Sequence, residues 1–308
     1  MTTLLYTHAA CLEHDPGRHH PESPDRLRAV LAALATPEFA GLERREAPEA
    51  AIEDLARVHP RSFVERLLAA VPAAGHAGID ADTVLCPGSG RAALRAAGAV
   101  VAAVDAVVAG EADNAFCAVR PPGHHAEPLR AMGFCLFNNV AVGALRARAA
   151  HRLARVAVVD FDVHHGNGTQ ARFWDDPGLF YASTHQSPLY PGTGAASESG
   201  VGNIVNVPLP PLAGSRQFRL GFSAEILPAL DAFRPQMVLI SAGFDGHKSD
   251  PLAQLLLDEA DYAWATAELA AIARRHALGR IVSTLEGGYD LAALVASTAA
   301  HLRALMAA

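Results

Sequence analysis

The sequence predicts a single α/β domain over residues 1–308, with a largely parallel β-sheet covered by helices on both faces. Three observations support this fold class. Short apolar segments alternate along the chain with longer segments rich in Ala, Leu and Arg. The apolar segments are continuous rather than alternately apolar and polar, which is typical of parallel strands buried on both faces. With 51% hydrophobic and 19% charged residues, the chain can form a large core.

The predicted strands and helices follow one another along the whole chain. The expected strands lie at 3–7, 115–120, 155–162, 179–184, 203–208, 237–242 and 280–286. The expected helices lie at 24–35, 61–71, 88–109, 136–150, 215–233, 258–277 and 290–306. The most apolar stretch, 92–110, is interrupted by Arg95 and Asp105, so it is predicted to be a core helix rather than a membrane span.

Charge and cysteine content narrow the classes of partner and compartment. The net charge is −7 and no Lys/Arg-rich block occurs, so we expect neither nucleic acid nor a membrane as partner. No C-x-x-C pair occurs among the four cysteines, which are therefore expected to be free thiols of a cytoplasmic protein. The N-terminal residues lack a basic region and a long apolar run, so no signal peptide is expected. Nothing indicates the oligomeric state, and a homo-oligomer remains open.

Four predicted strands run directly into polar, glycine-rich segments. These segments are PPGHHA at 121–126, DFDVHHGNG at 160–168, FDGHKSD at 244–250 and EGGYD at 286–290. In open parallel α/β sheets, ligands bind beyond the carboxyl ends of the strands. The four segments are therefore predicted to converge on one crevice.

Two of these segments offer metal ligands. Asp162 and His164 are two positions apart, so on an extended segment their side chains point to the same side. A carboxylate and an imidazole together suit zinc, and Asp245 at the end of another strand is the natural third ligand. Three ligands leave the metal an open face for water and substrate, as catalytic sites do. Capping and turn roles are the alternative, which the presence of two strand-end clusters disfavours.

The adjacent His124 and His125 suggest a general acid and base pair near one bond. Each imidazole needs an acceptor that orients it, and Asp160 and Asn167 could serve. A carboxylate partner raises the basicity of the imidazole, whereas an amide partner orients it without doing so. A metal site or ordinary loop histidines are the alternatives. Tyr289 follows two glycines, so its phenol could swing over a developing oxyanion, although a packed tyrosine is the common reading of this pattern.

Taken together, the segments resemble the zinc-dependent histone deacetylases, in particular the class II and bacterial amidohydrolase branch. Five segments stand in the order of that family: RPPGHHA, GFCLFNN, VAVVDFDVHHGNGTQ, SAGFDGHKSDPLA and LEGGY. The resemblance covers roughly residues 1–306. It implies the arginase-deacetylase fold, with a mostly parallel eight-stranded sheet between helical layers. It also implies hydrolysis of an N-acyl amide with one zinc ion per chain.

The resemblance assigns roles to the candidate catalytic residues. The zinc ligands would be Asp162, His164 and Asp245. His125 would be the general base and acid, and His124 an electrostatic partner held by Asp160. Asn167 stands where class I members have Asp, so the dyad on His125 is His-Asn as in class II. Tyr289 would polarise the acyl carbonyl together with zinc.

The same resemblance implies a substrate tunnel and a rim. The tunnel would include Gly133, Phe134, Tyr190, Leu252, Gly287 and Gly288. Tyr190 takes the place of a family Phe, which narrows or polarises one wall, and Leu252 occupies a position where some polyamine-selective relatives carry Glu. Asp80 and Asp82 are two alternatives for the rim aspartate that grips the substrate backbone.

A potassium ion and an acetate exit are implied as well. Oxygens of Asp160, Asp162, His164, Ser183 and Thr184 would bind potassium, several through backbone carbonyls. Arg26 resembles the arginine beneath the active site that is linked to acetate exit.

Several functions fit this machinery. The expected substrate is an acylated amine, with acetyl-lysine of proteins or peptides favoured by the apolar Leu252, and acetylpolyamines or other small acyl-amines as the alternative. A non-catalytic acyl-lysine binder would have lost a ligand or the tyrosine, and all are present. An arginase-like binuclear manganese site needs D-x-H-x-D, but Gly166 occupies the last position.

Overall fold

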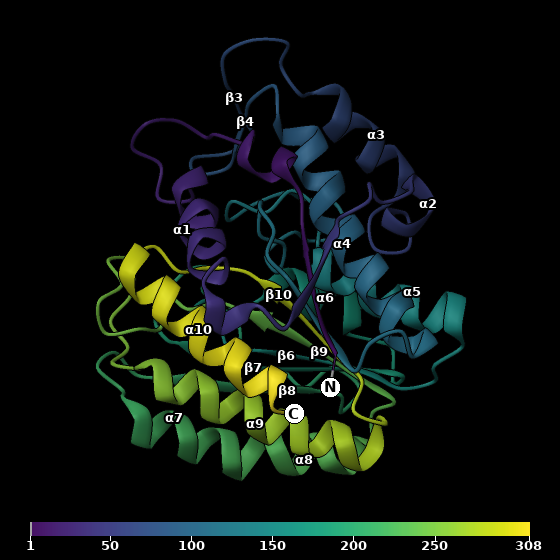
Figure 1. Cartoon of the computed structure of the whole chain (residues 1–308), viewed down its shortest axis with the longest axis vertical. Helices are drawn as coiled ribbons and strands as arrows, with labels where there is room; N and C mark the ends of the chain where they lie inside the picture. Colours follow the sequence, from purple (N-terminus) through teal and green to yellow (C-terminus); the bar gives the residue numbers. More distant parts are fainter. Residues whose placement is uncertain (1) are drawn as a thin grey trace.

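The computed structural model describes residues 2–308, and eight of its strands form one sheet (Figure 1). These strands are β1 (Thr3–Thr7), β2 (Leu42–Glu46), β5 (Asn114–Cys117), β6 (Val156–Asp160), β7 (Leu179–Gln186), β8 (Ile204–Leu209), β9 (Met237–Ala242) and β10 (Ile281–Leu285). Their spatial order is β2-β1-β5-β10-β9-β6-β7-β8, and all neighbours pair in parallel. The predicted parallel α/β fold is confirmed.

Helices cover both faces of the sheet. One layer contains α1 (Pro24–Leu34), α7 (Ser215–Gly221), α8 (Leu227–Phe233), α9 (Glu259–His276) and α10 (Leu291–Met306). The other contains α2 (Ile52–Leu55), α3 (Arg61–Ala69), α4 (Ser89–Ala109), α5 (Asn139–His151) and α6 (Asn167–Phe173). In the first layer α10 packs between α1 and α9, and in the second α4 packs on α5 and on the sheet (Figure 1).

Small residues bring α4 close to its neighbours. The helix is long and apolar enough to cross a membrane, but it packs against α5, β1 and β5. A Cβ atom at Gly98 would lie 2.0 Å from the Pro48 carbonyl oxygen, so only glycine allows this approach. The helix therefore belongs to the core, as the interruption of its apolar stretch by Arg95 and Asp105 predicts.

The structure also contains elements that the sequence pattern did not predict. The edge strand β2 reads LERRE and pairs only with β1, so its charged side chains remain accessible to solvent. A small hairpin of β3 (Ala77–Gly78) and β4 (Val84–Leu85) carries the candidate rim aspartates between its strands. The predicted helix at 215–233 is divided by a π-helical turn at Phe222–Ile226, shortly before Pro228, which has no N–H to donate.

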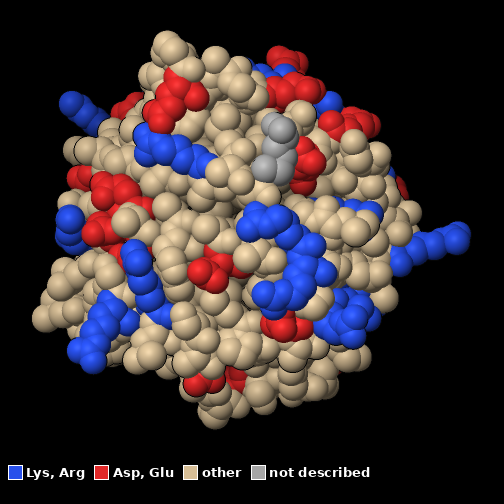
Figure 2. All heavy atoms as spheres, turned by 60° about the horizontal axis from the view of Figure 1, so that its bottom comes forward, with Lys and Arg blue, Asp and Glu red and all other residues tan. Residues whose placement is uncertain are grey.

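The middle of the sheet positions the four polar, glycine-rich segments, because β5, β10, β9 and β6 are consecutive neighbours. Parallel strands end at the same edge, so the segments that follow these four strands emerge side by side. Figure 2 shows one face of the molecule, on which basic and acidic side chains are interspersed and several basic side chains lie near the centre.

Candidate functional site

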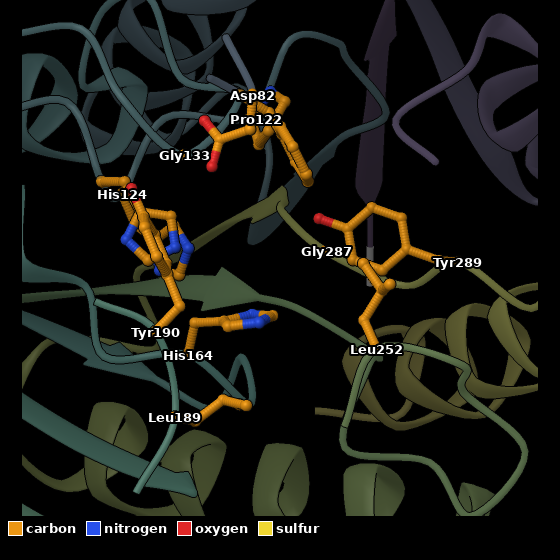
Figure 3. Close-up of a pocket in the computed structure, with 12 residues that line it drawn as sticks. Asp82, Pro122, His124, Gly133, His164, Leu189, Tyr190, Leu252, Gly287 and Tyr289 are labelled. Carbon is orange, nitrogen blue, oxygen red and sulfur yellow. The ribbon is translucent and has the colours of Figure 1, made fainter. Parts of the chain in front are cut away.

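The segments that follow the four central strands enclose a cavity of about 230 Å³ (Figure 3). Its walls are completed by Leu189 and Tyr190, which follow β7, by Gly133 and Phe134, and by Asp82 of the β3–β4 hairpin. The cavity is lined by Asp82, Pro122, His124, His125, Gly133, Phe134, His164, Leu189, Tyr190, Leu252, Gly287 and Tyr289.

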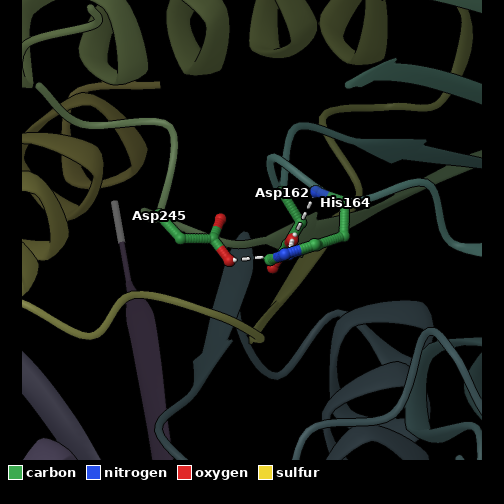
Figure 4. A group of neighbouring side chains, drawn as sticks. All are labelled: Asp162, His164 and Asp245. Atoms are coloured by element: carbon green, nitrogen blue, oxygen red, sulfur yellow. Dashed lines mark hydrogen bonds and ion pairs between the residues drawn. The ribbon is translucent and has the colours of Figure 1, made fainter. Parts of the chain in front are cut away.

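Three candidate metal ligands lie together at the base of this cavity. Ligand atoms of Asp162, His164 and Asp245 all lie within 4.8 Å of one another. The Nδ1 atom of His164 is 3.0 Å from Oδ1 of Asp162 and 3.2 Å from Oδ2 of Asp245 (Figure 4). Among residues 2–308 this is the one such group of three or more acidic, histidine or cysteine side chains. It could hold a single metal ion.

The local backbone differs from the extended segment that the sequence predicted. Strand β6 ends at Asp160, and the chain then bends instead of continuing as a strand. The N–H of Asp162 donates to Oδ1 of Asp160, and the N–H of His164 donates to Oδ1 of Asp162. These hydrogen bonds, rather than strand periodicity, direct both ligands toward the cavity.

Two glycines leave room for the carboxylates. A Cβ atom at Gly243 would lie 2.0 Å from Oδ2 of Asp162, and one at Gly287 would lie 2.0 Å from Oδ2 of Asp245. The N–H of Gly287 also donates to Oδ2 of Asp162 at 2.8 Å, and that of Val163 donates to Oδ1 of Asp245 at 2.9 Å. Backbone donors thus orient both carboxylates, as expected around a metal centre.

The ligand group concentrates negative charge. Burial lowers the pKa of His164, but hydrogen bonds and charge from Asp162 and Asp245 raise it to about 10. Burial raises the pKa of Asp162, but His124 and His164 hold it well below its usual range. Burial and the neighbouring Asp162 raise the pKa of Asp245. A cation bound between the carboxylates would relieve their repulsion.

The tandem histidines have different partners. Nδ1 of His124 lies 3.0 Å from Oδ2 of Asp160, whereas Nδ1 of His125 lies 2.8 Å from Oδ1 of Asn167. Burial lowers the pKa of His124, but Asp160 and Asp162 raise it to about 10. Burial lowers the pKa of His125 well below 6.5, and His124 lowers it further. His125 is therefore the neutral imidazole, and its Nδ1–H donates to the amide oxygen, which leaves Nε2 free to accept a proton.

Tyr289 extends its hydroxyl toward the cavity from the opposite side (Figure 3). The guanidinium carbon of the buried Arg26 lies 4.8 Å from the centroid of the phenol ring. Burial raises the pKa of Tyr289 well above 10, although Arg26 opposes this shift. The phenol thus keeps its proton and can act as a hydrogen-bond donor. Gly288 has a φ of 125°, which glycine tolerates and other residues rarely adopt.

The upper walls of the cavity are mainly apolar. Phe134 lies edge-on to Tyr289, with a ring-centroid distance of 5.9 Å, and Tyr190 lies edge-on to His125 at 5.1 Å. Gly133 has a φ of 57°, and a Cβ atom there would lie 2.5 Å from Cδ2 of His125, so glycine brings this wall close to the histidine. The exposed edge of Leu252 lies at the mouth.

The structure separates the two rim candidates. Asp82 lines the cavity and its carboxylate points inward (Figure 3). Oδ1 of Asp80 instead accepts the N–H groups of Asp82 and Thr83, at 3.2 and 2.8 Å. Asp80 therefore holds the turn, and Asp82 is the one of the two that faces the cavity.

The residues named for potassium lie next to the metal group. Asp160 at the end of β6 pairs in register with Ser183 of β7, and Thr184 follows it. All three are buried. Oδ1 of Asp160 is occupied by the N–H of Asp162, while Oγ of Ser183 lies 2.9 Å from Nδ1 of His185.

Sequence reasoning missed several acidic residues around the site. Glu286 accepts the N–H groups of Gly123 and His124, which joins the histidine and tyrosine segments. Oε1 of Glu127 accepts a hydrogen bond from Nδ2 of Asn167 at 2.8 Å, so it fixes which end of the amide faces His125. Glu127, Asp250 and Glu286 all lie in or beside the quoted motifs, and their position there was the available signal.

Comparisons with known proteins identify the family of the chain. Residues 20–305 match the histone deacetylase domain. Chloroplastic histone deacetylase 14 of Arabidopsis thaliana is 40% identical over 98% of this chain and 76% of its own length. The histone deacetylase-like amidohydrolase of Pseudomonas aeruginosa is 40% identical over 94% of this chain and 82% of its own.

Similarity extends to an archaeal protein and to a solved structure. A probable deacetylase of Archaeoglobus fulgidus is 38% identical over 100% of this chain and 87% of its own. The crystal structure of the HDA15 HD domain matches with a TM-score of 0.93 and 37% identity, covering 99% of this chain and 88% of that one. The predicted family resemblance and the arginase-deacetylase fold are confirmed. The chain belongs to the histone deacetylase family, whose members are deacetylases and related amidohydrolases.

Proposed function

We propose that the protein is a zinc-dependent deacylase that removes the acetyl group from acetyl-lysine of proteins or peptides. One observation carries the proposal. The buried Asp162–His164–Asp245 group opens into the same cavity as the neutral imidazole of His125 and the phenol of Tyr289. A ligand group, a base and an oxyanion donor around one cavity are the parts that metal-assisted amide hydrolysis requires.

The ligand group fits one zinc ion per chain. Two carboxylates and one imidazole form a borderline donor set with an open side toward the cavity. When bound there, zinc would polarise the acyl carbonyl and acidify water. The binuclear alternative is disfavoured because a Cβ atom at Gly166 would lie 2.4 Å from Oδ2 of Asp160, which leaves no space for a further carboxylate.

The remaining steps belong to side chains of the protein. Nε2 of His125 would take a proton from the attacking water, because its Nδ1–H is already donated to Asn167. The phenol of Tyr289 would donate to the oxyanion of the tetrahedral intermediate. His124 would remain protonated beside Asp160 and stabilise developing negative charge. A protonated histidine then delivers a proton to the leaving amine. The intact set disfavours a non-catalytic acyl-lysine binder.

Two features support a peptide substrate. The narrow cavity with its apolar Phe134 and Leu252 walls suits the methylene chain of an acyl-lysine. Beside the mouth, a surface groove of about 450 Å³ shares Asp82 and Phe134 with the cavity and offers room for flanking residues. The carboxylate of Asp82 could accept backbone N–H groups of such a peptide.

The same aspartate favours a second candidate, an acetylpolyamine. A carboxylate at the mouth attracts the free ammonium group of a small acylated polyamine. The two candidates share the chemistry described above and differ only in what contacts Asp82.

We also propose that potassium binds among oxygens of Asp160, Asp162, His164, Ser183 and Thr184, and that Arg26 lines the route of the acetate product. The pairing of Asp160 with Ser183 supports the former, because it joins the two segments beside the metal group. The burial of Arg26 beneath Tyr289 supports the latter.

Hydrolysis of a matched panel tests the proposal. The zinc-loaded protein would be assayed on an acetyl-lysine peptide and on N-acetylated putrescine, cadaverine and spermidine, each with and without a chelator. Chelator-sensitive turnover led by the peptide is the expected result. Turnover led by acetylpolyamines would assign the second candidate, and zinc-loaded protein without any turnover would contradict the hydrolase proposal.

A variant of Asp82 tests its contact with the substrate at the rim. Asp82→Asn should raise KM for the preferred substrate more than it lowers kcat, because Asp82 binds rather than reacts. Asp25→Asn, on the exposed surface of α1, is the matched control and should leave both constants unchanged.

A further inference from the structure

The loop that carries Tyr289 is held from its carbonyl side by Arg26. Nε of Arg26 donates to the carbonyl oxygen of Gly288, and Nη2 donates to that of Glu286, both at 2.6 Å. The same guanidinium lies against the phenol ring. These contacts hold the loop through two of its carbonyl groups. Arginine is only a hydrogen-bond donor, so the N–H groups of the loop need an acceptor from elsewhere.

The N–H side of the loop is held by Asp250. Oδ2 of Asp250 accepts hydrogen bonds from the N–H of Tyr289 at 2.7 Å and from that of Asp290 at 3.4 Å. Its other oxygen, Oδ1, accepts the N–H of Leu252 at 3.0 Å. Asp250 is only 7% exposed, so water cannot easily replace these contacts.

One carboxylate therefore joins two walls of the cavity. Leu252 and Tyr289 both line it and lie near each other in Figure 3. The segment that supplies Asp250 also supplies Asp245, five residues earlier. Through Asp250, the tyrosine is tied to the same loop that carries a candidate metal ligand.

The loop needs such a tie because two glycines precede the tyrosine. Glycine restricts the backbone least of all residues, so Gly287 and Gly288 alone would allow the phenol to move. The Tyr289 hydroxyl points into the cavity, where it is available to a substrate. Its position depends on the backbone contacts and on the stacked Arg26.

We propose that Asp250 is a positioning residue for Tyr289: its carboxylate fixes the backbone of the tyrosine relative to Leu252 and the metal group, and thereby aims the phenol at the acyl carbonyl. This inference rests on the proposed deacylase function. An amide cannot replace the carboxylate well, because its NH₂ group would face a backbone N–H on one of the two sides.

A double-mutant cycle tests whether Asp250 acts through Tyr289. Asp250→Asn should lower kcat about tenfold, with KM and zinc content close to wild type, because a misplaced donor loses stabilisation made in the transition state. In a Tyr289→Phe background, where no hydroxyl remains to aim, the same substitution should change kcat by less than about twofold. Equal losses in both backgrounds, or no loss in either, would overturn the proposal.

Asp258→Asn is the matched control. Asp258 also follows β9, but it caps α9 by accepting the N–H of Ala260 at 3.0 Å, away from the cavity. Asparagine caps helices as well as aspartate does, so this variant should behave as wild type in both backgrounds.

Hydrogen exchange supplies a readout that does not require turnover. In Asp250→Asn, amide exchange in 286–290 should accelerate, whereas exchange in 156–160 should not change. Unchanged exchange in 286–290 would contradict the positioning role of Asp250, whether or not the wild type hydrolyses a substrate. Absence of turnover by the wild type would instead refute the proposed function. Should Asp250→Asn fail to fold, Asp250→Glu would displace the carboxylate and keep its charge, and the same non-additivity with Tyr289→Phe is expected.

Discussion

The imidazole rings of His124 and His125 lie 4.0 Å apart between centroids, yet the pKa values of the two side chains are shifted in opposite directions. The carboxylate partner of His124 stabilises the imidazolium, whereas the amide partner of His125 orients the ring without adding charge. Once His124 is protonated, its charge lowers the pKa of His125 further. The difference between Asp160 and Asn167 thus assigns the positive charge to one ring and the proton-accepting role to the other.

Replacing Asn167 by Asp should reduce this asymmetry. A carboxylate beside Nδ1 would raise the pKa of His125, so the base would become protonated at a higher pH. We expect the acidic limb of the pH profile of kcat/KM to move upward by about one pH unit or more. Glu127→Gln, which keeps an acceptor for the Asn167 amide, should leave that limb close to wild type. An unmoved limb in Asn167→Asp would contradict the assignment of His125 as the base.

Tyr289→Phe removes only the phenol hydroxyl. We expect kcat to fall by about two to three orders of magnitude, the usual effect of losing one oxyanion donor, while zinc content stays unchanged. Tyr6→Phe is a matched control because Tyr6 lies in β1, away from the cavity. Kinetics and metal analysis of the folded variants would settle the role, and near-wild-type turnover in Tyr289→Phe would refute it.

The strand pattern predicted the frame of the site because buried parallel strands leave a strong local signal. Seven of the sheet strands were expected near their observed positions, and the polar ends of four of them meet around one cavity. The charged edge strand β2 was missed because it has one neighbour and no continuous apolar run. Its presence depends on pairing with β1, which local sequence does not report.

The supporting contacts of the site could not be predicted for a related reason. The hydrogen bond between Asp250 and Tyr289 joins residues 39 positions apart, and Arg26 reaches Gly288 across 262 positions. Nothing in the spacing of either pair indicates that the residues meet. Likewise, Asp80 and Asp82 are equivalent in the sequence, and only the turn geometry shows which one faces the cavity.

Gly287→Ala tests the space around the metal group. The added Cβ atom would lie 2.0 Å from Oδ2 of Asp245 and 2.6 Å from Oδ2 of Asp162, so at least one carboxylate must move. We expect weaker zinc binding and a large loss of turnover, because catalytic constellations tolerate displacements of only about 0.5 Å. Zinc affinity would be measured by competition with a chromophoric chelator.

Gly214→Ala provides the control for this substitution. A Cβ atom at Gly214 would approach the Leu256 carbonyl oxygen no closer than 3.4 Å, an ordinary contact distance. The variant should bind zinc as wild type does. Wild-type zinc affinity in Gly287→Ala would show that the carboxylates are not confined as the structure indicates.

A buried histidine that does not line the cavity should make stability depend on pH. His301 is fully buried between Thr266 and Ser283, whose hydroxyl oxygens lie 2.6 and 2.8 Å from its ring nitrogens, and burial lowers its pKa to about 3. In the unfolded chain its pKa is about 6.5, so between about pH 6.5 and pH 3 the unfolded state binds one more proton at this residue. The free energy of unfolding should therefore fall as the pH is lowered through this window.

His301→Gln should remove this contribution, because glutamine can bond both hydroxyls without taking up a proton. Urea unfolding at several values between about pH 6.5 and pH 4 should show a slope of stability against pH that is shallower than wild type, by up to about 1.4 kcal/mol per pH unit. His19→Gln, on an exposed loop, should keep the wild-type slope. Equal slopes in wild type and His301→Gln would contradict this prediction, because they would mean that His301 is already protonated in the folded protein. The two hydroxyl partners and the apolar surroundings of His301 oppose protonation, since they supply no negative charge to stabilise the imidazolium.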